Sequence, residues 1–122
     1  MFRVNIFRRN TGTADLAALT PMEFEILLSL AGGARHGYAI IHDIAERSDG
    51  TLTVRPGTLY RAIARLLGAG IIAEVDGDRR GDERRRYYAI TAEGRRLADV
   101  EARRLERQVV TARARRLLKA LR

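Results

Sequence analysis

Hydrophobic residues recur at spacings of three and four in four stretches of the chain, which is the period of an amphipathic helix. Between the third and fourth stretches lie two short runs rich in isoleucine, valine and tyrosine, as strands are. The predicted helices and strands are, in chain order, residues 21–31, 37–47, 56–69, 71–75, 84–90 and 92–122. The pattern therefore predicts a mainly α-helical fold with a small β-hairpin ahead of the last helix.

The first predicted helix starts at a capping box. Thr20 stands at the N-cap, Pro21 at the first helical position and Glu23 three residues after the cap. Gly32 and Gly33 end the helix. Its expected buried residues are Phe24, Leu27, Leu28 and Ala31. We assign this helix to the hydrophobic core.

The second predicted helix, residues 37–47, ends at a Ser-Asp-Gly turn and carries its apolar face on isoleucines. His36 and Tyr38 lie at its start, where backbone N–H groups favour an anion. This position suits a phosphate contact and equally a capping or packed role. Because His36 and His42 are six positions apart and no carboxylate or cysteine cluster accompanies them, we predict no metal site.

The third predicted helix, residues 56–69, has the pattern of a helix that lies against a polyanion. One face carries the aliphatic residues Leu59, Ile63 and Leu66 at helical spacing. The other face carries Thr58, Arg61 and Arg65 beside the small residues Ala64 and Gly68. Such a combination is typical of a DNA recognition helix. With the preceding helix it forms a helix-turn-helix-like pair, joined through a β-prone run at residues 51–54.

The two predicted strands flank a polar turn, residues 76–83, that contains two glycines. Strand alternation puts Arg86, Tyr88 and Ile90 on one face and Arg85, Tyr87 and Ala89 on the other. A hairpin that follows a recognition helix and carries arginines toward its tip is a wing. The alternative is a solvated loop whose acidic residues neutralise its arginines. We favour phosphate contact, because the arginines continue into the strand, where they are held in place.

The last predicted helix is long, because residues 95–122 contain neither proline nor glycine. A helix of about 28 residues would be ~40 Å in length. Its apolar stripe moves round the helix, so we expect its first part to pack on its own domain and its far end on a second copy. The expected dimerisation residues are Val110, Ala114, Leu117, Leu118 and Leu121.

The length of 122 residues, of which 46% are hydrophobic, fits one small domain with an accessory element. We divide it into an N-terminal segment at 1–18, a helix-turn-helix and hairpin domain at 19–91, and a C-terminal helix at 92–122. In the first segment Phe2, Val4 and Ile6 alternate with polar residues. A packed or disordered segment is the favoured interpretation, and a basic arm on DNA is the alternative.

The net charge of +8 is expected for a nucleic-acid or anionic partner. All but one of the 23 basic residues are arginine, which also fits a codon preference. Whether the charge indicates an anionic partner therefore depends on where the arginines lie in the chain. The chain has no cysteine, no apolar run of ~20 residues and no signal-peptide core at its start. We therefore expect a cytoplasmic protein without a membrane partner.

Several motifs follow one another in a distinctive order. They are Leu19-Thr20-Pro21-Met22-Glu23-Phe24, His36-Gly37-Tyr38-Ala39-Ile40, Pro56-Gly57-Thr58-Leu59-Tyr60, Arg65-Leu66, Gly70-Ile71-Ile72 and Arg85-Arg86-Tyr87-Tyr88-Ala89-Ile90-Thr91-Ala92-Glu93-Gly94. Across about residues 19–97 the chain resembles the PadR-like winged-helix transcriptional regulators of bacteria. The resemblance implies a homodimer that binds operator DNA as a repressor, often of a neighbouring transporter or detoxification gene.

The chain departs from that family pattern in three places. Arg61 stands where proline is usual, and Leu67 stands where glutamate is common. The C-terminal region is a single helix, shorter than in the larger members. Whether a small-molecule effector is sensed stays open.

The sequence thus predicts a winged helix-turn-helix with a long C-terminal dimerisation helix. Thr58, Arg61 and Arg65 would face the major groove, where arginine can bind guanine O6 and N7 bidentately. The residues expected to position the module on the DNA backbone are Tyr38, Tyr60, Arg84 and Arg85.

Two other classes of function were weighed. The first is a winged helix used for protein–protein contact without specific DNA binding. The second is an enzyme, but no serine–histidine–acid set, phosphate loop or ligand cluster occurs at a useful spacing. We therefore predict a protein that is not an enzyme and needs no cofactor.

Overall fold

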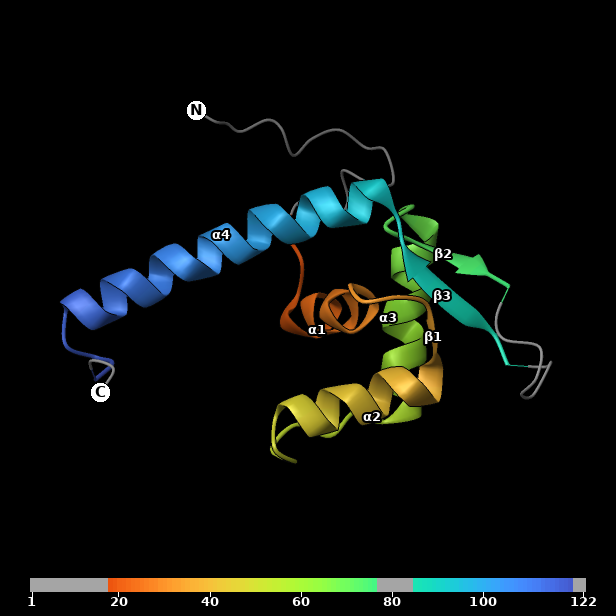
Figure 1. Cartoon of the computed structure of the whole chain (residues 1–122), viewed down its shortest axis with the longest axis horizontal. Helices are drawn as coiled ribbons and strands as arrows, with labels where there is room; N and C mark the ends of the chain where they lie inside the picture. The colour runs from red at the N-terminus through yellow and green to blue at the C-terminus, as the bar shows by residue number, and fades with distance from the viewer. Residues whose placement is uncertain (1–17, 77–84, 120–122) are drawn as a thin grey trace.

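The computed structural model describes residues 18–76 and 85–119 (Figure 1). Its elements, in chain order, are α1 (Pro21–Leu30), β1 (Arg35–His36), α2 (Gly37–Arg47), α3 (Pro56–Gly68), β2 (Ile72–Val75), β3 (Tyr87–Ile90) and α4 (Ala92–Ala114). The predicted fold class, mainly α with a small hairpin and a long last helix, is confirmed. Residues 1–17, Arg84 and Leu121 lie outside the described residues.

Helices α1, α2 and α3 pack on one hydrophobic core, with the sheet against α1 and α3 (Figure 1). The apolar faces predicted for α2 and α3 are confirmed. Their core residues, each no more than 2% exposed, are Ile40, Ile44, Leu59, Ile63 and Leu66. The long aliphatic face of α3 thereby leaves its opposite face in solvent.

The capping box of α1 is confirmed, but the predicted buried face of this helix is wrong at Leu28 and Ala31. The Glu23 N–H donates to Thr20 Oγ1 at 3.1 Å, and the Thr20 N–H donates to Glu23 Oε1 at 2.8 Å. Leu28 is 43% exposed and Ala31 is also exposed. Leu27 is buried as predicted and Phe24 packs against the core, and the other buried residues are Glu23, Ile26, Ser29 and Leu30.

The physical reason for this error is that α1 is apolar on nearly every side, so periodicity alone cannot select a face. Two polar residues fix the orientation. Glu23 and Ser29 are buried because they find partners in Arg65 of α3 and Asp43 of α2. A pattern of hydrophobicity assigns both to solvent.

The sheet has three antiparallel strands in the order β1-β3-β2. The predicted hairpin is confirmed in its strands, with Ile72 opposite Ile90, but both strands are shorter than predicted. Strand β1 was not predicted from the sequence, and in it His36 pairs with Tyr87. Residues 51–54 form no strand, and Val54 lies in the core instead.

Helix α4 ends at Ala114, so the prediction of a helix to residue 122 is wrong. The Leu117 N–H donates to the Ala112 carbonyl at 2.8 Å, and the Arg116 N–H donates to the Arg113 carbonyl at 3.1 Å. This is a Schellman motif, with Arg116 in the left-handed region at φ 66°. The same motif ends α3 at Gly70, and there the helix end can be predicted from the sequence because the residue in the left-handed region is a glycine. Leu117 and Leu118 therefore follow the helix instead of lying on it.

Helix α4 is attached to the domain by its first turns. Thr91 caps it, accepting from the Gly94 N–H at 3.0 Å and donating to the Ile71 carbonyl at 2.9 Å. Gly94 lies so close to the Ile71 carbonyl that any Cβ would overlap it. Leu97 packs against the core, and the later turns project beyond α1 (Figure 1). In the described part of the chain, no helix is long and apolar enough to cross a membrane.

The attachment of α4 can be tested with two glycine substitutions. Gly94→Ala should destabilise the domain by roughly 1–3 kcal/mol, since its methyl group meets the backbone of Ile71. Gly68→Ala is the control: an added Cβ meets nothing within 4 Å, and alanine should stabilise α3 by about 0.5–1 kcal/mol. Urea unfolding followed by circular dichroism measures both. Equal effects of the two substitutions would contradict the close contact at Gly94.

Candidate nucleic-acid interface

The start of α2, one side of α3 and strand β3 meet around a hollow at the edge of the domain. The hollow has a volume of about 350 Å³. Its lining residues are His36, Gly37, Tyr38, Tyr60, Arg85, Arg86 and Tyr88. The structure thus brings together Tyr38, Tyr60 and Arg85, three of the residues predicted from sequence to contact DNA.

The outer face of α3 is exposed, as the sequence predicts. Thr58 and Arg61 are both in solvent, and the N-cap residue of α3 makes no side-chain hydrogen bond to the first turn. Arg55 stands at this uncapped start. Free N–H groups at a helix N-terminus, with an arginine beside them, make an electropositive end suited to an anion.

Arg65 is occupied by an ion pair. Its Nη2 lies 2.6 Å from Oε2 of Glu23, a residue that is only 1% exposed. The other carboxylate oxygen of Glu23 accepts the N-cap bond of α1. Arg65 therefore joins α3 to the start of α1, whereas Arg61 has no such partner among the described residues.

Tyr60 and Tyr38 present their rings at the mouth of the hollow. Tyr38 is 64% exposed and Tyr60 is 43% exposed. A Cβ at Gly37 would overlap the Tyr60 hydroxyl, so this glycine leaves room for the Tyr60 ring beside the start of α2. The glycine in the sequence motif His36-Gly37-Tyr38 is thereby explained by the space that Tyr60 needs.

His36 caps α2, so the capping role among the alternatives left open by the sequence is present in the structure. Its Nδ1 accepts from the Ala39 N–H at 3.1 Å, and its ring meets Tyr87 edge-on at 5.3 Å. Its Nε2 lies 2.7 Å from Arg85 Nη1. Burial, and then the Arg85 charge, lower the pKa of His36 from 6.5.

On the wing, Arg85 and Arg86 are exposed, and Arg86 Nε lies 3.9 Å from Glu74 Oε2. Tyr88 is 3% exposed although its side chain lines the hollow. Burial raises the pKa of Tyr88, with smaller contributions from Tyr60 and Glu74. His36 was considered for a phosphate contact because of its place at a helix start, whereas Tyr88 was not predicted as a site residue, and its only signal was its place in a short motif.

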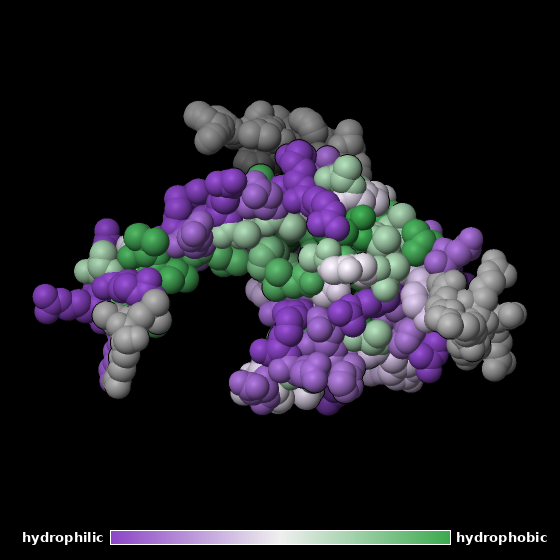
Figure 2. All heavy atoms as spheres, viewed as in Figure 1, coloured by the Kyte–Doolittle hydropathy of each residue, from purple (hydrophilic) through white to green (hydrophobic). Residues whose placement is uncertain are grey.

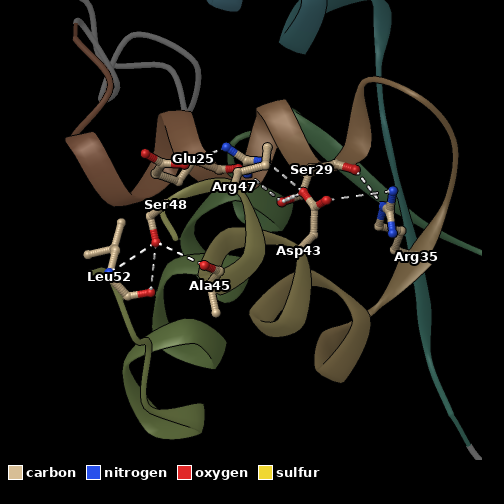
Figure 3. Close-up of polar contacts among 8 residues, drawn as sticks. All are labelled: Glu25, Ser29, Arg35, Asp43, Ala45, Arg47, Ser48 and Leu52. Atoms are coloured by element: carbon tan, nitrogen blue, oxygen red, sulfur yellow. Dashed lines mark hydrogen bonds and ion pairs between the residues drawn. The ribbon is translucent and has the colours of Figure 1, made fainter. Parts of the chain in front are cut away.

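A polar cluster on another side of α2 fixes this helix against α1 (Figure 3). Arg47 donates to Glu25 Oε1 and to Asp43 Oδ2, both at 2.8 Å, and the Ser29 hydroxyl donates to Asp43 at 2.8 Å. These bonds, led by that of Arg47, lower the pKa of Asp43. Because its members satisfy one another, we assign the cluster to holding α2, and with it His36, in place. No cluster of histidine, cysteine and acidic residues suited to a metal occurs among the described residues.

Comparison with known proteins gives one matching family. The model of the "Transcriptional regulator PadR-like family" matches residues 26–99. A curated relative, an uncharacterised protein from Lysinibacillus sphaericus, is 33% identical over 61 residues, which are 50% of this chain and 56% of that protein. The chain therefore spans only about half the length of this relative.

Solved structures extend the comparison. A transcriptional regulator from Clostridium thermocellum is 30% identical, with a TM-score of 0.62, over 80% of this chain and 92% of that one. Bacillus subtilis PadR, solved in complex with operator DNA, is 21% identical, with a TM-score of 0.57, over 66% of this chain and 46% of that one. At this low identity the second similarity shows a shared fold.

The different environments of Arg65 and Arg61 can be tested on stability. Arg65→Met should cost about 1–2 kcal/mol, because it leaves the buried Glu23 carboxylate without its cation; the exposure of Arg65 keeps the cost below that of a fully buried pair. Arg61→Met, the matched control on the same helix, should change the free energy of unfolding by less than about 0.5 kcal/mol. Urea unfolding measures both. A similar cost for the two would contradict the structural role of Arg65.

Proposed function

The chain belongs to the PadR-like family of transcriptional regulators, and on this premise we propose that it binds operator DNA as a homodimeric repressor. The observation that carries the proposal is the meeting of the start of α2, the exposed side of α3 and the arginines of β3 at one edge of the domain. The family is one of transcriptional regulators and not of enzymes. The proposed action is therefore binding and occlusion of a promoter.

In this proposal α3 enters the major groove. Its buried aliphatic face fixes the helix on the core, so its outer side chains are presented from a rigid element. Arg61 and Thr58 are the base-contacting residues, Arg61 by a bidentate bond to guanine. Arg65 was predicted for the same role, but we now propose that it orients α3 through Glu23. The operator complex of the Bacillus subtilis protein, which has the same fold, supports this use of the fold.

Contacts to the DNA backbone would come from the residues around α3. Tyr38 and Tyr60 offer hydroxyl groups, and Arg85 offers a charge, all from the one hollow. Arg84 keeps its predicted place in this set, although it lies outside the described residues. Such contacts set the register of the module and carry no base preference.

We further propose that the dimer forms through α4. Apolar atoms gather on the side of α4 that faces α1 and again near its far end (Figure 2). Between α1 and α4 runs a groove of about 220 Å³, lined by Phe24, Leu28, Ala98 and Ala102 among others. Beyond it, the exposed apolar residues are Val109, Val110, Leu117 and Leu118.

A two-fold arrangement accounts for both apolar surfaces. The far end of each α4, with Val110, Ala114 and the turn at 117–118, would pack in the groove of the other copy. Leu121 was predicted for the same interface and lies outside the described residues. Two modules joined in this way would bind half-sites of a palindrome about one DNA turn or a multiple apart.

The second candidate function is a winged helix that contacts another protein. The exposed arginines at an uncapped helix start favour DNA, because a duplex offers a continuous row of phosphates to them. Selection from a random duplex pool by the full chain distinguishes the two. Enrichment of an inverted repeat supports the operator, and a pool without any enriched sequence would favour the protein partner.

Base recognition by Arg61 is the sharpest test on the selected duplex. Arg61→Met should weaken binding to it by about 10–100-fold, which corresponds to one lost bidentate base contact. Binding to a scrambled duplex should change little. Fluorescence anisotropy at several salt concentrations measures both. Equal loss on the two duplexes would reassign Arg61 to phosphate, and no loss on either would remove α3 from the groove.

The dimer is tested by two substitutions in one turn of α4. Val110→Glu places a carboxylate in the proposed apolar interface and should give a monomer at micromolar concentration. Gln108→Glu adds the same charge on the polar side and should leave the dimer intact. Sedimentation velocity measures the mass of each. A monomeric unmodified chain, or a dimeric Val110→Glu variant, would show that the interface lies elsewhere.

A further inference from the structure

His36 faces more hydrogen-bond donors than it can accept. The Ala39 N–H points at its Nδ1 at 3.1 Å, and Nη1 of Arg85 lies 2.7 Å from its Nε2. A neutral imidazole carries one proton and therefore accepts at one nitrogen only. In either neutral tautomer, the ring nitrogen that carries the proton therefore faces another donor: the Ala39 N–H if the proton is on Nδ1, and Arg85 if it is on Nε2. A doubly protonated ring would face a donor at both nitrogens.

The two donors that face His36 differ in how far they can move. The Ala39 bond is part of the helix cap and is fixed by the backbone. Arg85 is exposed, and its guanidinium can turn toward another acceptor. An anion in the hollow would draw Arg85 away, and the proton on Nε2 would then have an acceptor as well.

Tyr88 gives independent evidence for a ligand at the same place. Its side chain is only 3% exposed and lines the hollow, and its hydroxyl makes no hydrogen bond to the other described residues. A phenol hydroxyl is one donor and one acceptor, so this one is free to bond a group that enters the hollow. A ligand oxygen in the hollow would accept its proton.

We propose that this hollow binds a single phosphate group of the DNA backbone, and that Arg85 leaves His36 to bind it. The phosphate oxygens would accept from Arg85, from the hydroxyls of Tyr88 and Tyr60, and from Nε2–H of His36. This inference rests on the proposed function and adds two residues, His36 and Tyr88, to the interface.

The chemistry of the lining selects phosphate. Guanidinium, phenol and imidazole groups line the hollow, and among the described residues no carboxylate does so. Glu74 lies 3.9 Å from Arg86 and is not among the lining residues. With a volume of about 350 Å³ the hollow exceeds one phosphate, which leaves room for the sugars on either side.

The test observes the two histidine rings of the full chain by ¹⁵N NMR. Inorganic phosphate is added at constant ionic strength against chloride, and a short random duplex is added in a second arm. We expect a saturable change at His36 in both arms, with its proton fixed on Nε2. His42 is exposed on α2 and serves as the internal control, which should not respond.

Two variants connect the response to the hollow. Tyr88→Phe removes only the hydroxyl, so the buried ring and the fold are retained, and phosphate binding should weaken about tenfold. Arg85→Gln should abolish the His36 response to phosphate and weaken duplex binding at every sequence. Backbone spectra of both variants verify the fold.

The outcomes separate this inference from the proposed function. If the duplex binds while His36 stays unchanged, or if His42 responds equally, the phosphate site is wrong and DNA binding stands. If free phosphate alone moves His36 and the duplex does not, the site takes the free anion and the assignment to the DNA backbone is overturned. If no duplex binds at all, the proposed function fails, whatever the phosphate arm shows.

Discussion

The buried carboxylate of Glu23 is the interaction on which the arrangement of the helices depends. One oxygen closes the cap of α1 and the other binds Arg65 at 2.6 Å, so the start of one helix and the outer side of another share a single group. A charge with 1% exposure is tolerated only where it is paired and hydrogen-bonded. The aliphatic core supplies the stability, and this carboxylate selects how α3 is oriented within it.

The sequence predicted those elements in which one signal dominates. Proline and glycine bound α3, its stripe of Leu59, Ile63 and Leu66 has one period, and all three residues are buried. Where hydrophobic periodicity does not select one face of a helix, the prediction of its buried residues was wrong. Helix α1 is apolar on most sides, and its orientation depends on partners of Glu23 and Ser29 that lie far away in the sequence. Strand β1 has two residues and exists only because β3 lies beside it.

The candidate site was predicted less completely than the fold, for a related reason. Tyr38, Thr58 and Arg61 are exposed and polar, so residue type and helical position suffice to propose them. Tyr88 is buried in the core layer, and the capping of α2 by His36 is a matter of geometry. No residue pattern reveals that the two lie at one hollow. The end of α4 was missed because Arg116 takes a conformation in which glycine is usual.

The attachment of α4 at Gly94 has a mechanical consequence. The 23 residues of α4 make a rigid lever of about 35 Å, hinged where the helix rests on the Ile71 carbonyl. A tilt of about 5° at that hinge displaces the far end by about 3 Å, close to the rise of one DNA base pair. In a dimer joined by these far ends, the spacing between the two DNA-binding surfaces would be tuned at a glycine that never touches DNA. In the proposed dimer, substitutions that shift the contact at Gly94 would therefore change the half-site spacing that the two modules fit.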